Sequence, residues 1–115
     1  MDVFGWILQG LLAGAFFMAG AGKISGTTMH TKNFDHWRLP QWFRVVTGLV
    51  ELAAAVLLII GYWQQTALLA GAALLVITGF GGVLTHIRVK DSLKDTLPIA
   101  VLGILAIILL SITTG

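Results

Sequence analysis

The sequence contains no cysteine, only two prolines and little charge. The absence of cysteine excludes disulfides, thiolate metal sites, CxxC redox chemistry and covalent haem attachment. Charged residues make up 10% of the chain, whereas about a quarter of an ordinary soluble domain is charged. The net charge of +2 is too small to indicate binding to nucleic acid, so no nucleic-acid partner is predicted.

Hydrophobic residues are abundant instead. They account for 57% of the 115 residues, and the mean hydropathy is +0.94. A chain of this length buries only about two-thirds of its surface on folding, so it cannot hide so much apolar area from water. The composition therefore predicts a single integral membrane domain whose partner is the lipid bilayer. The N-terminus lacks the basic region of a signal peptide, and its long apolar run is expected to remain as a helix.

Four apolar segments approach the length of about 20 residues that a membrane-spanning helix needs. They predict an all-α four-helix bundle with helices at about residues 3–22, 43–62, 66–86 and 97–113. The connections at 23–42 and 87–96 lie on one side, and a tight turn lies on the other. Pro98 is expected in the first turn of the last helix, where its missing N–H is harmless.

The basic residues are confined to one side of this bundle. They lie in or beside the two longer connections: Lys23, Lys32, Arg38, Arg44, Arg88, Lys90 and Lys94. The positive-inside rule predicts a multi-pass protein of the cytoplasmic membrane, with these connections in the cytoplasm and both termini outside. The first connection mixes charges with apolar anchors (Met29, Phe34, Trp37 and Trp42). It predicts a short amphipathic interfacial segment before Pro40 turns the chain back into the bilayer.

Small residues mark possible helix contacts. Gly10 and Gly14 form a GxxxG pair in the first span, and such pairs allow close approach of helices in lipid. Two interpretations remain open: packing within the bundle, or the face of a homo-oligomer.

Glu51 is the most unusual residue, because it is a lone carboxylate within an apolar span. An ionisable group in a membrane helix costs roughly 2.5–3.5 kcal/mol on insertion scales, so it usually faces the protein interior. Thr47 and Gly48 are one turn earlier and are expected on the same face. Four cationic or titratable residues lie at the same end of the bundle: Lys23, Arg44, His86 and Arg88.

Two interpretations of this cluster remain open. Glu51 could pair with Lys23 or His86 and simply fix the packing of the helices. Alternatively, the candidate residues Glu51, Lys23, His86, Arg88, Thr47 and Gly48 line a polar pocket in the inner leaflet that binds a head group, a quinone ring or a proton. His86 is the best candidate for proton handling, because imidazoles titrate near neutral pH. No complete catalytic set is evident, and the spacing of His30, Asp35 and His36 fits no standard metal site.

Three segments resemble the DoxX-like membrane proteins: Phe17-Met18-Ala19-Gly20-Ala21-Gly22-Lys23-Ile24, Leu39-Pro40 and Gly48-Leu49-Val50-Glu51. The resemblance covers essentially the whole chain, and Lys23, Pro40, Gly48 and Glu51 match the family pattern. The namesake of this family is a small subunit of a thiosulfate:quinone oxidoreductase. Other relatives are linked to oxidative-stress complexes or act as assembly chaperones.

The resemblance implies an accessory or quinone- and lipid-contacting subunit of a membrane redox system, with quinone as a possible cofactor and a redox subunit as a possible partner. A sulfur relay on this chain is disfavoured because it has no cysteine. One alternative is a structural or chaperone-like module that assists other membrane proteins. Another is a small proton-coupled multidrug exporter, although those proteins carry their glutamate in the first helix and not in the second. As an isolated chain, the protein is not expected to be an enzyme.

Overall fold

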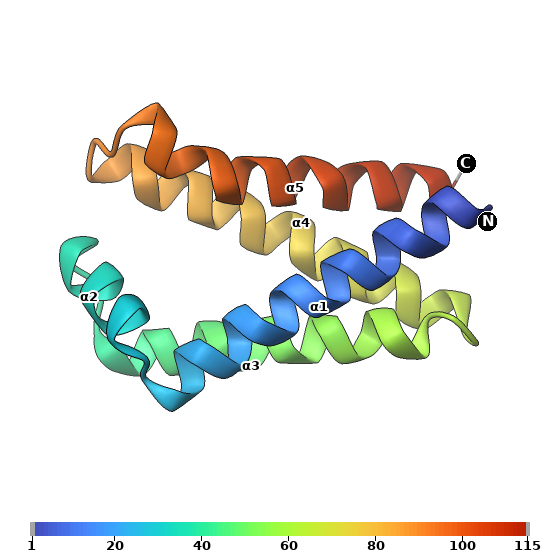
Figure 1. The fold of residues 1–115 in the computed structure, drawn as a ribbon, viewed down its shortest axis with the longest axis horizontal. Coiled ribbons are helices and arrows are strands. Elements are labelled where there is room, and N and C mark those ends of the chain that lie inside the picture. Colours follow the sequence, from blue (N-terminus) through green and yellow to red (C-terminus); the bar gives the residue numbers. More distant parts are fainter. Residues whose placement is uncertain (1, 115) are drawn as a thin grey trace.

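Five α-helices form the computed structural model, which describes residues 2–114 and has no strand within them (Figure 1). They are α1 Val3–Ser25, α2 Thr28–His36, α3 Gln41–Ile60, α4 Gln65–Arg88 and α5 Leu93–Thr114. All except α2 are long and apolar enough to span a membrane, which confirms the all-α membrane bundle. The helix α2 occupies the predicted interfacial segment. Met1 and Gly115, the termini that were predicted to lie outside the cell, are not among the described residues.

The α1 helix continues three residues beyond its predicted end, and its C-terminal cap explains where it stops. Gly26 has a left-handed backbone with φ of 76°, and its N–H donates to the carbonyl of Gly22. Glycine adopts this conformation at no steric cost, so it ends the helix after Ser25. Only Gly26 and Thr27 separate α1 from α2, which folds α2 back against the end of α1.

The α5 helix begins four residues earlier than predicted. The Ser92 hydroxyl accepts a hydrogen bond from the N–H of Asp95, so it caps the first turn at a place that the apolar pattern did not mark. Pro98 therefore lies inside the helix, beyond the first turn, and the prediction for this proline was wrong. Its missing N–H leaves one helical hydrogen bond unmade at that point.

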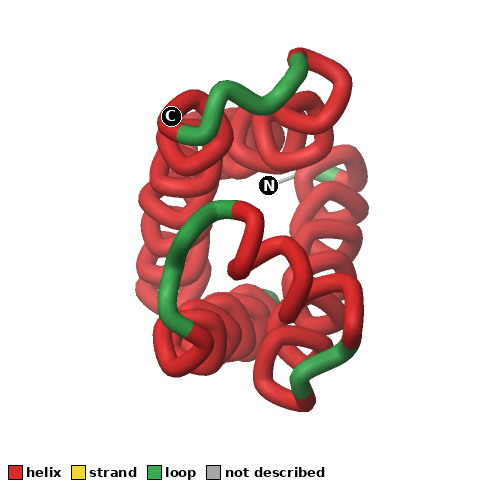
Figure 2. Tube along the Cα trace, turned by 90° about the vertical axis from the view of Figure 1, so that its left-hand side faces the viewer, coloured by secondary structure: helices red, strands yellow, loops and turns green. Residues whose placement is uncertain are grey.

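The four long helices form two close pairs, α1 with α3 and α4 with α5, which are joined through the α3–α4 hairpin. Figure 2 shows these helices around the bundle axis, with α2 across one end. We call this end, which also carries the 89–92 loop, the α2 end. The opposite end, with the 61–64 turn, the start of α1 and the end of α5, is called the turn end (Figure 1).

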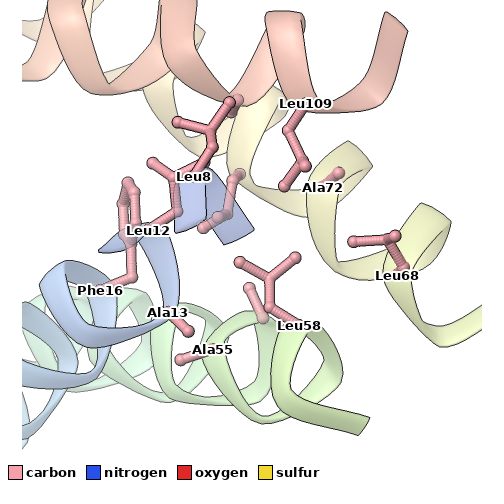
Figure 3. Close-up of a cluster of buried hydrophobic side chains, with 12 residues drawn as sticks. Leu8, Leu12, Ala13, Phe16, Ala55, Leu58, Leu68, Ala72 and Leu109 are labelled. Atoms are coloured by element: carbon pink, nitrogen blue, oxygen red, sulfur yellow. The ribbon is translucent and has the colours of Figure 1, made fainter. Parts of the chain in front are cut away.

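The apolar core contains buried side chains from all four long helices (Figure 3). The largest are Leu12, Phe16, Leu58, Leu75 and Leu109. In Figure 1 the two helix pairs diverge from one another toward the α2 end. The polar residues of the candidate site lie in that half of the molecule.

Glycines allow close helix contacts at places that the GxxxG pair did not predict. A Cβ atom at Gly48 would lie 2.8 Å from the carbonyl oxygen of Gly20, so α1 and α3 touch there through their backbones. Gly79 and Gly103 form a similar contact between α4 and α5. Nothing lies within 4 Å of a Cβ at Gly14, so packing within the bundle does not account for this glycine.

A Cβ at Gly10, the other member of the GxxxG pair, would lie 3.0 Å from the Tyr62 hydroxyl. Gly10 therefore adjoins one aromatic side chain and makes no close helix crossing. A homo-oligomer face at Gly10 and Gly14 stays a prediction.

Candidate functional site

Lys23 and Glu51 form a buried ion pair between α1 and α3. The distance from Lys23 Nζ to Glu51 Oε1 is 2.7 Å, and the side chains are 12% and 3% exposed. Each residue lies three positions after a glycine of the Gly20–Gly48 contact, on the same face of its helix. The absence of side chains at that contact brings the two helices together and places the charges within reach of each other. Lys23 thus occupies the position that the sequence suggested for a partner of Glu51.

Arg44 was a further candidate partner of Glu51, but the structure places its guanidinium elsewhere. It donates hydrogen bonds to the backbone carbonyl of Lys23 and to the side-chain oxygen of Gln41. A cation that binds the free carbonyls at a helix C-terminus is favoured by the helix dipole. Arg44 therefore fixes the end of α1, and with it the backbone that carries Lys23.

Thr47 lies in the first half of α3, and Pro40 lies directly before that helix. The Thr47 hydroxyl donates to the carbonyl of Phe43 in its own helix, at 2.8 Å, and the side chain is partly exposed. Its place one turn before Glu51 on α3 agrees with its predicted face, and its hydroxyl is bonded within the helix. Pro40 has an extended backbone and directly precedes the first residue of α3.

His30 of α2 lies beside the pair, and sequence reasoning did not assign it to this site. Its ring covers Gly22 so closely that a Cβ there would lie 2.9 Å from His30 Cδ2. Burial lowers the pKa of His30, and the nearby positive charges of Lys23 and Arg44 lower it further. The imidazole is therefore neutral at neutral pH. Only two residues link α1 to α2, so α2 must lie near the end of α1, and this short link could have predicted that His30 lies near Lys23.

His86, a predicted partner of Glu51, bonds to Asp91. It belongs to a second cluster, the Asp91 cluster, which comprises Asp91, His36, Trp37 and His86. His36 Nε2 lies 2.5 Å from Asp91 Oδ1, and His86 Nδ1 lies 2.7 Å from Asp91 Oδ2. The Trp37 indole N–H also donates to Asp91 Oδ2, at 3.3 Å. These contacts connect α2 to α4 and to the loop that follows it.

Arg88 contributes to the same connection, because its guanidinium donates to the backbone carbonyl of Trp37. Its predicted role beside Glu51 stays a prediction. The hydrogen bond from His36 lowers the pKa of Asp91, burial opposes this shift, and the bonds from His86 and Trp37 lower the pKa further. Asp91 is consequently a carboxylate that accepts from both helices.

The three residues considered for a metal site also have separate partners. His30 lies against Gly22, His36 contacts Asp91, and Asp35 accepts from the Gln41 amide at 2.8 Å. Two cavities, of about 240 and 230 Å³, lie at the turn end and between α4 and α5. Neither is lined by Glu51 or Lys23.

The Lys23–Glu51 pair brings together a hydrogen-bond donor from α1 and an acceptor from α3, both of which are apolar helices. The profile of the DoxX-like family matches residues 7–109, a range that includes Lys23, Pro40, Gly48 and Glu51. The chain belongs to the DoxX-like family. Together with its four apolar helices, this membership makes it an integral membrane protein.

This DoxX-like protein is also similar to an uncharacterized protein of Bacillus subtilis (strain 168), YdgD. The two are 31% identical over 81 residues, which cover 68% of this chain and 71% of YdgD. No solved structure matches the chain.

Proposed function

We propose that this DoxX-like protein is an accessory subunit of a membrane redox system and contacts a quinone at the Lys23–Glu51 pair. The observation that carries the proposal is the 2.7 Å ion pair within the spans, where an ionisable residue usually has a function. The Lys23 ammonium can donate to a quinone carbonyl, and the Glu51 carboxylate can accept from a quinol hydroxyl. The chemistry of this donor set therefore fits both forms of such a ring.

We further propose that the α2 end faces the cytoplasm. All seven lysine and arginine residues lie at or near this end, as the positive-inside rule requires of cytoplasmic connections. In this orientation the Lys23–Glu51 pair lies in the inner leaflet. Because the chain has no thiol, we assign the electron-donating group to a partner subunit, and the protein is not an enzyme on its own in this proposal.

A second candidate function is a structural or chaperone-like membrane module. It is favoured by the mutual neutralisation of Lys23 and Glu51, since paired charges often fix a helix arrangement without further chemistry. The proton-coupled exporter is less favoured, because those proteins carry their glutamate in the first span and Glu51 lies in α3, the second span.

Quinone titration tests the main proposal. The protein, reconstituted in lipid nanodiscs, is titrated with a short-chain quinone while its tryptophan fluorescence is recorded. We expect saturable quenching, with affinity reduced about tenfold or more in Glu51→Gln and in Lys23→Met, because a hydrogen bond to a charged group contributes about 1.5–3 kcal/mol. Thr78→Val is the matched control, since the Thr78 hydroxyl bonds only within its own helix.

The proposal fails if the wild-type protein does not bind quinone, or if both pair variants bind it as the wild type does. In that case, the structural module predicts co-purification of another membrane protein in mild detergent, and this co-purification would be lost in Glu51→Gln.

A further inference from the structure

The turn end of the bundle contains a cavity of about 240 Å³, far from the Lys23–Glu51 pair. It is bounded by α1, the 61–64 turn and the adjoining ends of α4 and α5. None of its lining residues is charged, and its polar and aromatic lining comes from Trp6, Gln9, Tyr62, Trp63, Gln65 and Thr113. This lining is unusual in a chain whose interior is otherwise almost entirely apolar.

Gln9 is the central feature of this cavity. The side chain is completely buried, and its Nε2 donates to the backbone carbonyl of Leu58 at 2.6 Å. A carbonyl oxygen can only accept, so the amide nitrogen must face it and Oε1 must point away from it. Gln9 Oε1 has no hydrogen-bond partner within residues 2–114. A buried acceptor without a donor is unfavourable, and Gln9 is one of the residues that line the cavity, so we infer that a donor bound there stabilises it.

Neighbouring polar groups are held in place by bonds of their own. The Tyr62 hydroxyl donates to the carbonyl of Trp6 at 2.6 Å, and the Gln65 amide nitrogen donates to the carbonyl of Thr113 at 3.2 Å. The Tyr62 hydroxyl thereby uses its donor and keeps its oxygen as an acceptor, whereas the Gln65 amide keeps a second N–H as well as its side-chain oxygen. The cavity therefore offers both acceptors and donors, and the indole N–H groups of Trp6 and Trp63 are among the donors.

We propose that this cavity binds the uncharged, hydroxyl-rich head group of an amphiphile, such as a sugar ring. A hydroxyl group both donates and accepts, so it suits a lining that carries both kinds of polar group, and the absence of charged lining disfavours ionic head groups. The volume equals that of about eight liquid waters at about 30 Å³ each, which suits a single six-membered ring. The rings of Trp6 and Trp63 provide the flat apolar surfaces that such sites commonly combine with a few polar groups.

Saturation-transfer NMR on the full-length protein in nanodiscs tests this site. The probe is methyl β-glucoside, and tetramethylammonium is the charged comparison. We expect transfer to the glucoside but not to tetramethylammonium. We also expect at least a fivefold loss of transfer in Gln9→Met, which removes the acceptor at nearly constant size.

Gln9→Met also removes the bond to Leu58, so a second variant separates binding from folding. Ile112→Phe fills the cavity from α5 without altering any hydrogen bond of Gln9. Its matched control is Ile107→Phe, which lies in the groove between α4 and α5. We expect Ile112→Phe to abolish glucoside transfer and Ile107→Phe to preserve it.

Three results would overturn the proposal: no glucoside transfer at tens of millimolar probe, equal transfer to tetramethylammonium, or undiminished transfer in Ile112→Phe. The test is independent of quinone binding, because its ligand, its variants and its end of the bundle are all different.

Discussion

The contact between Gly20 and Gly48 allows a sharp prediction for Gly48→Ala. The added Cβ would lie 2.8 Å from the Gly20 carbonyl oxygen and 2.9 Å from the Cβ of Lys23. Neither atom lies at the flexible end of a side chain, so the two helices must move apart. Overpacking of this kind costs about 3 kcal/mol at the upper end of its usual range, and alanine regains about 1 kcal/mol of helix propensity. We therefore expect a net destabilisation of about 2 kcal/mol.

Equilibrium unfolding in mixed micelles, followed by far-UV circular dichroism, measures this change. Gly14→Ala and Gly81→Ala are the matched controls, because nothing lies within 4 Å of a Cβ at either position. Both controls should be neutral or more stable by up to about 1 kcal/mol, from helix propensity alone. If Gly48→Ala proved as stable as Gly14→Ala, the close α1–α3 contact and the reasoning based on it would be refuted.

Three further predictions concern the two polar clusters. Glu51→Leu alone should lower the free energy of unfolding by about 3–5 kcal/mol, because it leaves the buried Lys23 charge unpaired. The double variant Lys23→Met with Glu51→Leu should unfold with a free energy within about 1 kcal/mol of the wild type. An equal loss of stability in both variants would contradict the claim that Lys23 and Glu51 neutralise each other. Asp91→Asn should increase hydrogen exchange in α2 while exchange within α5 stays unchanged. His36 lowers the pKa of Asp91 below its ordinary 3.8. The ionised Asp91 therefore stabilises the contacts of α2 at any pH above 3.8, and this stabilisation is lost only as the pH falls through the lower native pKa. The protection factors of α2 should therefore not decline between pH 7 and about pH 4, and a decline at pH 5–6 would refute this assignment.

The four spans could be predicted because lipid imposes a simple rule: about 20 apolar residues for each helix. The helix ends could not be predicted as closely, because single caps determine them. Gly26 ends α1, and Ser92 begins α5 four residues before the continuous apolar run. Such caps are common in sequences, and the apolar pattern does not indicate which of them are used.

The candidate site could be predicted only in part. The depth of Lys23 and Glu51 along their helices, together with a family motif, led to the pair that the structure contains. Depth also suggested His86, but residues at one depth can still face different neighbours. The decisive element was α2, whose His36 and Trp37 meet the same carboxylate as His86. Nothing in the apolar pattern indicates that a short polar helix will fold back to that loop.

The pairing of helices described above also bears on how the chain assembles during synthesis. Each close pair consists of successive spans, so its contacts join segments that are near one another along the chain. Such local contacts favour rapid folding, since little loop-closure entropy opposes them. The α1–α3 pair, with Lys23 already neutralised by Glu51, can form before α4 has been translated. The bonds from α2 to Asp91 can form only after α4 and the loop that follows it have been translated. They therefore join the α1–α3 pair to the α4–α5 half of the bundle at a later stage.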